Sequence, residues 1–422
     1  MTYSVNIGAA SGPVFIPAKY LNRHGLITGA TGTGKSVSII SLAESLTRIG
    51  VPVLITDVKG DLSGMAAPSA SSPPATAVTW YPEKSDVRFY DVYRQTGHPL
   101  QTSVKTLGPA IMARALGLSD VQAGILEICF AVARAEAMPL DTLDDLRSVA
   151  SYCAENRETV GRLYGLITPS SVAAIWRSIL RLESGGGAAF FSDTPSDVRE
   201  LLRVNPSGAG LVSMLDCTRL IRDPRLYGAV MLWILSTLAD VLPERGDADK
   251  PVFCLFIDEA HLVFKNGSPE LIDTVDQTVR LIRSKGVGVF FASQSPCDIP
   301  DGIAAMLHLR IQHALRAATP AQRNVIRAAA ESLPCPLGFR AIDVIGNLKP
   351  GTALLSYMDE SGSMTPADVV AIALPRCRLS PLSDAERAAH MPRPATVAPV
   401  NDAPAPHVGF LRSLLHYVGV FV

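Results

Sequence analysis

The sequence predicts an α/β protein with a mostly parallel sheet and a helical insertion, and three observations lead to this fold class. A phosphate-binding motif at residues 29–36 lies between an apolar run and a helix pattern. Further short apolar runs end abruptly in polar residues, as strands buried on both faces of a parallel sheet do. Between residues 103 and 202, apolar residues recur three and four positions apart, which indicates helices.

The phosphate-binding motif fills every fixed position of the pattern G-x-x-x-x-G-K-[ST]. Its members are Gly29, Ala30, Thr31, Gly32, Thr33, Gly34, Lys35 and Ser36. Glycines let the backbone wrap closely around an anion, so that consecutive N–H groups point at the phosphates. We expect Lys35 to reach the β- and γ-phosphates and the Ser36 hydroxyl to hold Mg²⁺. The alternative, a glycine-rich turn that arises by chance, is disfavoured by the strand and the helix on either side.

The residues around the motif form a strand–helix–strand unit. Residues 25–28 have the pattern of the end of a buried strand, residues 37–46 that of a helix, and Gly50 fits a helix stop. A second buried strand follows at 51–56 and ends in Asp57. A strand, a helix and a strand in this order form a βαβ unit, which predicts a parallel sheet.

The helix patterns interrupt a series of strand patterns that resumes after them and continues along the chain. We therefore interpret the chain as one α/β core with an insertion and not as separate modules. The core takes residues 1–102 and 203–378, and the helical insertion takes 103–202. Residues 379–422 form a Pro- and Ala-rich tail with a short apolar end.

Two acidic residues mark the second half of the core. The apolar run 252–257 ends in Asp258 and Glu259, and carboxylates at the end of a buried strand are costly unless a metal ion or polarised water meets them. We expect Asp258 to hold Mg²⁺ through water and Glu259 to activate the attacking water as general base. The alternative is an N-capping Asp with a Glu in the first helical turn. His261 is interpreted as a local hydrogen-bonding residue.

A polar amide follows the next apolar run. Residues 287–292 form that run, and Gln294 comes after it. An amide at the tip of the strand beside the acidic strand can touch both the γ-phosphate and the attacking water, so Gln294 is the candidate sensor. The alternative is an ordinary polar residue of a turn.

Two segments offer an arginine that could reach the γ-phosphate of a neighbouring subunit. One is an amphipathic helix pattern with Arg280, Arg283 and Lys285 beside its apolar face. The other is a strand pattern in which Arg310 and Arg316 share a face. The alternative is that these residues are ordinary solvated charges. The sequence alone does not decide between the two segments, in which Arg283 and Arg310 are the foremost candidates.

The composition limits the class of protein. With 422 residues, of which 48% are hydrophobic and 18% charged, the chain is a folded globular protein and not a disordered one. The net charge of −1 gives no overall basic field, although a ring can keep positive charge in a central channel. The seven cysteines form no C-x-x-C pair, which favours free thiols in a reducing compartment. Because no apolar run reaches about 18 residues, we expect no membrane span and a cytoplasmic protein.

Several stretches together resemble the HerA-like helicase family of RecA-type P-loop motors in the FtsK–HerA superfamily, particularly its bacterial YjgR-type branch. They cover most of residues 23–357. The stretches are 22–28 running into the phosphate loop, D-V-K-G-D-L-S-G at 57–64, D-E-A-H-L at 258–262, residues 279–289, and Q-H-A-L-R-A at 312–317.

The resemblance implies a RecA-like P-loop NTPase core, ATP hydrolysis with Mg²⁺, and a homo-hexameric ring with ATP between its subunits. It also implies a motor that applies force to double-stranded DNA in the channel. The residues that match the family's motifs are Lys35 and Ser36 for phosphate and Mg²⁺, Asp258 and Glu259 for the Walker B pair, and Gln294 for the sensor, with Arg283 in the segment that supplies the trans-acting arginine.

One departure from the family limits what is carried over. Archaeal HerA has a β-barrel before its motor and works with a nuclease, whereas only 28 residues precede Gly29 here, so we expect no barrel and do not carry the nuclease partnership over to this chain. Two other functions stay open: a secretion- or conjugation-type ATPase that moves protein, and a nucleotide-gated regulatory scaffold. The presence of Glu259 and Gln294 argues against the scaffold.

Overall fold

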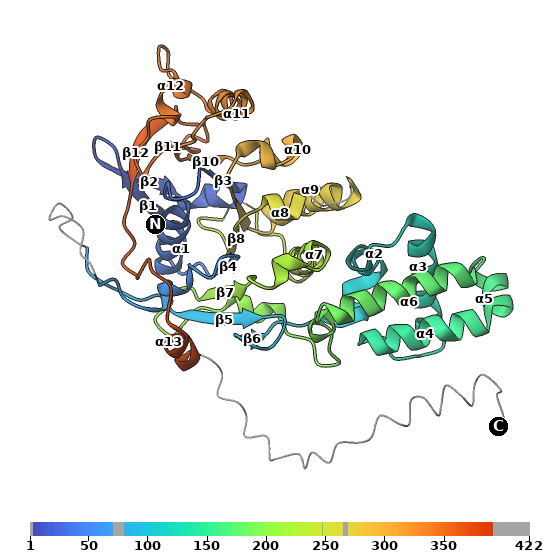
Figure 1. Cartoon of the computed structure of the whole chain (residues 1–422). Coiled ribbons are helices and arrows are strands. Elements are labelled where there is room, and N and C mark those ends of the chain that lie inside the picture. Colours follow the sequence, from blue (N-terminus) through green and yellow to red (C-terminus); the bar gives the residue numbers. More distant parts are fainter. Residues whose placement is uncertain (1–2, 71–79, 247, 265–268, 391–422) are drawn as a thin grey trace. The chain divides into compact units, whose positions relative to one another are not determined.

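The computed structural model describes residues 3–70, 80–246, 248–264 and 269–390 (Figure 1). Within these residues, twelve strands form a single mixed sheet. Eight strands form its parallel part, in the order β10 (Leu309–Gln312), β3 (Gly25–Thr28), β9 (Val287–Ser293), β8 (Phe253–Ile257), β4 (Val53–Asp57), β7 (Val212–Asp216), β5 (Val87–Asp91) and β6 (His98–Pro99). Beyond β10 the pairing is antiparallel, through β11 (Thr352–Ser356), β12 (Asp368–Ile372), β1 (Ser4–Ala9) and β2 (Pro13–Pro17). The predicted mostly parallel sheet is confirmed.

Helices cover both faces of the parallel part, so its central strands are buried throughout. On one face lies α1 (Lys35–Arg48), and on the other lie α7 (Pro224–Val241) and α9 (Pro269–Ser284) (Figure 1). Alternate strand residues serve the two layers, because side chains of a strand point alternately to opposite faces. Ile27 packs in the core with α1, whereas its neighbour Leu26 belongs to the core with α7. Continuous apolar runs in the sequence are therefore explained by burial on both sides.

The described part of the core contains five further helices. They are α8 (His261–Phe264), α10 (Asp301–Ala304), α11 (Pro320–Glu331), α12 (Ala341–Ile345) and α13 (Asp384–Ala389). Six 3₁₀ helices connect the described elements: η1 (Ala18–Arg23), η2 (Ser63–Ala66), η3 (Gly187–Phe190), η4 (Val198–Leu202), η5 (Leu220–Arg222) and η6 (Pro296–Asp298). Among the described residues, no helix is long and apolar enough to cross a membrane. The apolar end of the tail lies outside the described residues.

Five helices lie between residues 104 and 184, where the sequence predicts the insertion. They are α2 (Val104–Leu116), α3 (Asp120–Ala135), α4 (Leu143–Glu155), α5 (Arg157–Tyr164) and α6 (Pro169–Ser184). Side chains fix four of their starts: Ser103 caps α2, Ser119 and Thr142 form capping boxes, and Thr168 caps α6, which has proline at its first position. Since α2 packs against α7, the helices of this region share one hydrophobic core with the sheet layer.

The strand order decides which residues meet. The parallel strands all end at the same edge of the sheet, and β3 lies between β10 and β9 although both come much later in the chain. The register places Thr28 of β3 beside Ser293 of β9, and Asp57 of β4 beside Asp216 of β7. In open α/β sheets, ligands bind in the crevice outside these carboxyl ends. The residues that follow β3, β9, β8 and β4 therefore form the candidate site.

Candidate nucleotide site

The phosphate-binding loop connects β3 to α1, and its backbone requires its glycines. Gly32 has a φ of +77° and Gly34 a φ of +123°, both in the left-handed region that other residues rarely adopt. At Gly29, an added Cβ would lie 2.5 Å from the Cβ of His313, so no side chain fits there. Backbone N–H groups of such a loop and the N-terminus of the helix after it form an anion-binding concavity.

Lys35 is buried in the first turn of α1. Its Nζ donates hydrogen bonds to the backbone oxygens of Gly29 (2.7 Å) and Ala30 (3.3 Å). Burial lowers the pKa of Lys35, while the negative charges of Glu259 and Asp258 act in the opposite direction. The ammonium group thus lies over the loop and within electrostatic reach of both acids, where it could meet a terminal phosphate.

The two acids lie directly after β8 and are both buried, with exposed fractions of 5% for Asp258 and 3% for Glu259. The backbone N–H of Asp258 donates to the Thr56 hydroxyl of β4 at 2.9 Å, which fixes the end of β8. Burial, together with the charge of Glu259, raises the pKa of Asp258 to about 6. A buried carboxylate with a raised pKa is stabilised in its charged form by a nearby cation.

Glu259 is held from three sides. Lys59 Nζ lies 2.5 Å from its Oε1, while His261 Nδ1 and Gln294 Nε2 lie 3.2 Å and 3.5 Å from its Oε2. Its backbone has a φ of +46°, which is strained for a residue with a side chain. Burial raises the pKa of Glu259, but the hydrogen bond and charge of Lys59 outweigh burial and leave the pKa below its ordinary value. The side chain is therefore a carboxylate, as a general base must be.

The predicted residues are brought together by the strand order. Because β9 lies between β3 and β8, Gln294 at the end of β9 stands between the phosphate loop and the acids. Gln294 contacts Glu259, and Lys35 lies within electrostatic reach of Glu259. An amide and a carboxylate in contact beside a phosphate loop can orient a water molecule for attack on a phosphate.

The donor set fits magnesium held jointly by the protein and a bound nucleotide. Ser36 and Asp258 supply a hydroxyl and a carboxylate, which are hard oxygen donors of the kind that Mg²⁺ prefers. In the part of the chain that the structure describes, no group of three or more His, Cys, Asp or Glu side chains could hold a metal alone. Mg²⁺ commonly takes one or two protein ligands and completes its shell with phosphates and water, so Ser36 and Asp258 would hold it here.

A buried histidine that none of the sequence motifs predicts contacts the helix that follows the loop. His313 Nδ1 lies 2.9 Å from the backbone oxygen of Thr352, and its Nε2 lies 2.8 Å from the Ser38 hydroxyl. Since burial lowers its pKa to about 4, the ring is neutral: Nδ1–H donates to Thr352 and Nε2 accepts from Ser38. It thereby ties α1 to β10 and β11. The sequence does not predict that His313 lies beside Gly29, because the two residues are brought together only by the fold.

The two foremost arginine candidates lie away from the phosphate loop of their own chain. Arg283 is in the last turn of α9, shortly before β9 begins, and its backbone oxygen accepts from Asn22 at 3.4 Å. Arg310 is in β10 beside Leu26 of β3, and its Nη2 donates to the backbone oxygen of Ala304 at 2.9 Å. The structure therefore does not bring either residue to Glu259 and Gln294 within one chain.

The other basic candidates are engaged in local contacts. Arg280 pairs with Asp276 at 2.8 Å on α9, and Lys285 Nζ donates to the backbone oxygen of Leu242 at 2.7 Å. The Arg316 guanidinium donates to the backbone oxygen of Gly346. These contacts fix the side chains on the protein's own surface.

Several solved structures share the fold of this chain at low sequence identity. The conjugative coupling protein TrwBdeltaN70 in complex with sulphate is 15% identical, with a TM-score of 0.61 over 90% of this chain and 91% of that chain. Plasmid coupling protein TrwB with ADP and Mg²⁺ is 15% identical, with a TM-score of 0.59 over 89% and 90%. VirB4 of Thermoanaerobacter pseudethanolicus is 18% identical, with a TM-score of 0.57 over 87% and 96%. These likenesses confirm the predicted RecA-like P-loop fold.

The sequence itself identifies the family. A search of the curated proteins gave no match. The family model described as Helicase HerA-like C-terminal matches residues 3–404, which is nearly the whole chain and includes the phosphate loop, both acids and Gln294. The predicted resemblance is therefore confirmed: this chain belongs to the family of the helicase HerA-like C-terminal domain.

Proposed function

We propose that the protein binds ATP with Mg²⁺ and hydrolyses it as a ring-forming motor that translocates double-stranded DNA. The observation that carries the ATPase part is the convergence of Lys35, Glu259 and Gln294 at one edge of the sheet. The phosphate loop binds the nucleotide, and Glu259 with Gln294 can activate a water molecule. A hydrolase needs such a pair, whereas a site that only binds phosphate does not.

In this mechanism each residue has one task. The N–H groups of the loop bind the phosphates, and Lys35 neutralises charge on the β- and γ-phosphates. Gln294 orients the attacking water, and Glu259 accepts its proton through a carboxylate oxygen. Mg²⁺, held by Ser36 and Asp258, would polarise the phosphate oxygens and neutralise negative charge as the bond to the leaving group breaks.

A ring of subunits would explain why the two candidate arginines lie away from the phosphate loop of their own chain. Arg283 and Arg310 lie away from the phosphate loop of their own chain, so either could complete the site only of another subunit. We propose a homo-hexamer, in which ATP at one subunit's sheet edge meets an arginine of the next. An arginine placed in this way stabilises the charge of the transition state and makes hydrolysis depend on assembly.

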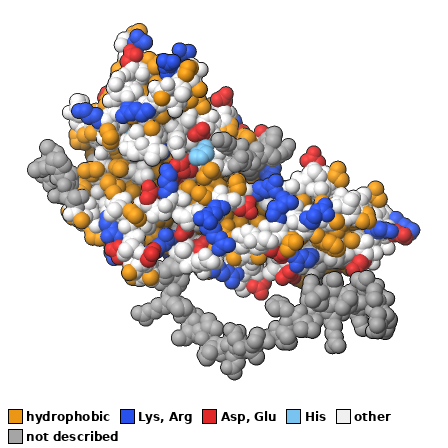
Figure 2. Space-filling model, viewed as in Figure 1, with side chains coloured by type: hydrophobic (Ala, Val, Ile, Leu, Met, Phe, Trp, Pro, Cys, Tyr) orange, Lys and Arg blue, Asp and Glu red, His pale blue; other side chains and the backbone are white. Residues whose placement is uncertain are grey.

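The DNA part is supported by family membership and by the fold shared with conjugative coupling proteins. Overall charge does not contribute, because the chain carries a net charge of −1 and the face drawn in Figure 2 mixes Lys and Arg with Asp and Glu. A DNA motor of this composition must gather its contacts in a channel and not on its outer surface. We place the protein in the cytoplasm, where ATP and DNA are both available.

The test is the steady-state ATPase rate against protein concentration, with and without double-stranded DNA, for the wild type and Glu259→Gln. We expect a rate per subunit that rises with concentration, rises further with DNA at low salt, and falls at least about a hundredfold in Glu259→Gln. Glu127→Gln on the exposed face of α3 is the matched control and should leave the rate unchanged. A Glu259-dependent rate that ignores DNA would favour a motor that moves protein, and no hydrolysis at all would favour a regulatory scaffold.

A further inference from the structure

Lys59 contacts the general base directly but lies outside the phosphate loop, the acidic pair and the sensor; it belongs to the stretch 57–64, to which no role in the site has been assigned. We propose that Lys59 is a positioning residue for Glu259, and that the segment 376–390, which we call the strap, fixes the loop that carries Lys59. This inference rests on the proposed ATPase function. It adds to that function a residue that acts through Glu259, and a segment that lies more than 100 residues after Glu259 in the sequence.

The contacts of Glu259 divide between its two oxygens. Lys59 Nζ bonds to Oε1 at 2.5 Å, whereas His261 and Gln294 both approach Oε2. A carboxylate with a different partner on each oxygen has its plane and its direction fixed. Because Gln294 must also orient water, the bond from Lys59 is the one that sets the rotation of Glu259 without competing for that water.

Burial and strain make this bond necessary. The side chain of Glu259 is 4% exposed, so solvent cannot replace a lost partner, and the backbone at +46° gives the side chain no ordinary conformation to relax into. The charge of Asp258 is adjacent and repels that of Glu259. Lys59, with a side chain that is 43% exposed, brings a compensating charge from the solvent side.

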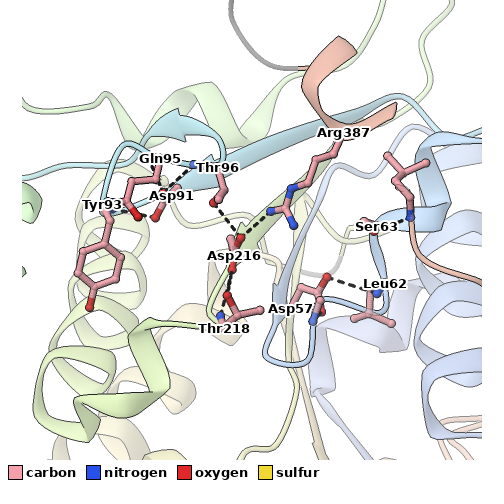
Figure 3. A network of polar contacts seen from close by, with 12 residues as sticks. Asp57, Leu62, Ser63, Asp91, Tyr93, Gln95, Thr96, Asp216, Thr218 and Arg387 are labelled. Carbon is pink, nitrogen blue, oxygen red and sulfur yellow. Dashed lines mark hydrogen bonds and ion pairs between the residues drawn. The ribbon is translucent and has the colours of Figure 1, made fainter. Parts of the chain in front are cut away.

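The loop that carries Lys59 folds back on the end of β4. The carboxylate of Asp57 accepts the backbone N–H of Gly60 at 2.7 Å and that of Leu62 at 3.3 Å, so the loop closes around the Asp57 side chain (Figure 3). Lys59 lies within this closed loop. Its ammonium group is therefore delivered to Glu259 from a loop of defined shape.

The strap contacts the residues that come directly after this loop. Its Leu382 N–H donates to the Ser63 hydroxyl at 3.0 Å, and the Arg378 N–H donates to the Ala67 oxygen at 2.9 Å. At Gly64, an added Cβ would lie 2.2 Å from the backbone oxygen of Ser380, so the two backbones are in direct contact. These contacts restrain the residues that directly follow the loop that carries Lys59.

The end of the strap is anchored on the neighbouring strand. Arg387 of α13 lies 2.6 Å from the Asp216 carboxylate, which also accepts from the hydroxyls of Thr96 and Thr218 (Figure 3). Asp216 pairs in register with Asp57, the residue around which the Lys59 loop folds. The strap is thus tied both to the loop and to the strand beside it.

The test compares Lys59→Met and Lys59→Arg with a matched control, Lys105→Met. Lys105 forms an ion pair of 2.8 Å with Asp141 in the helical region, away from the site. We expect Lys59→Met to lower kcat by about tenfold or more, with KM for ATP and Kd for a fluorescent ADP analogue within about twofold of the wild type. Lys59→Arg, which keeps the charge and the donors, should return kcat to within about threefold, and Lys105→Met should change nothing.

A second variant tests the strap without touching the acids. Ser63→Ala removes the bond to Leu382 and should lower kcat about two- to fivefold, again at unchanged KM. It also tests the proposal if Lys59→Met fails to fold, which thermal denaturation would reveal.

Two results would overturn the inference. An unchanged kcat in Lys59→Met would show that Glu259 does not need this partner. Weaker binding of ATP with unchanged binding of ADP would show that Lys59 contacts the γ-phosphate and acts directly. If the wild type shows no hydrolysis that depends on Glu259, the proposed function itself fails, and this outcome is distinct from both.

Discussion

His24 makes the stability of the protein depend on pH in a way that can be calculated. It lies between η1 and β3, where the residue is 1% exposed. Its Nε2 lies 3.0 Å from the backbone oxygen of Val279, and the backbone N–H of Val289 donates to its Nδ1 at 3.0 Å. One ring nitrogen must donate and the other accept, so the fold requires the neutral ring. Burial lowers the pKa of His24 to about 4.

The sign of the effect follows from the two states. In the unfolded chain His24 takes up a proton near its ordinary pKa of 6.5, whereas in the folded protein it does so only near pH 4. Its contribution to the free energy of unfolding is therefore complete above pH 6.5 and is lost as the pH falls from 6.5 towards 4. The interval corresponds to about 3 kcal/mol in total, of which about 2 kcal/mol are lost by pH 5.

The assay is urea denaturation at pH 8 and pH 5 of the wild type and His24→Asn. Asparagine has no group that takes up a proton between pH 8 and pH 5, so this variant removes the titration at position 24. Loss of packing makes the variant less stable at pH 8, and we expect this difference to shrink by about 2 kcal/mol at pH 5. Burial raises the pKa of Asp57 to about 7, so this residue increases the free energy of unfolding as the pH falls. The increase is the same in both proteins and cancels in the comparison. A difference that is the same at both pH values would refute the reasoning.

Three other variants test the loop, its support and the strap. Gly34→Ala imposes a side chain on a φ of +123° and should weaken binding of a fluorescent ADP analogue at least about tenfold, while Gly124→Ala, in open space on α3, should not. Ser38→Ala leaves His313 without its hydrogen bond from α1 and should cost about 1–3 kcal/mol in urea denaturation; a loss below about 0.5 kcal/mol would contradict that role. Arg387→Ala should cost about 1–2 kcal/mol, because the buried Asp216 loses its cation; equal midpoints for variant and wild type would argue against a tight strap.

The local motifs were predictable from the sequence because each is contained in a few consecutive residues. The phosphate loop, Asp258, Glu259 and Gln294 each follow a short buried strand, and the polar residue after such a strand lies at the sheet edge in any parallel sheet. The pattern therefore predicted both the fold class and the residues that converge. The roles of these residues, and those of Arg283 and Arg310, stay predictions.

The features of the site that the sequence did not predict depend on contacts between residues that are far apart in the chain. Lys59 and Glu259 are 200 residues apart, and nothing in either stretch predicts that β4 lies beside β8. His313 likewise supports α1 only because β10 pairs with β3. Within the predicted helical region, α5 buries a single residue, Val160, so its packing depends little on its own sequence.

The position of β3 between β9 and β10 has a consequence for synthesis of the chain. Both of its partners are made roughly 260 to 280 residues after it, which takes roughly 15 to 55 s at about 5–20 residues per second. During this time Leu26 and Ile27 have no sheet neighbours, and both edges of the strand are open to pairing with other chains. The nascent chain therefore carries a complete phosphate-loop sequence for most of its synthesis without a nucleotide site, and it is most exposed to misassembly before β9 emerges.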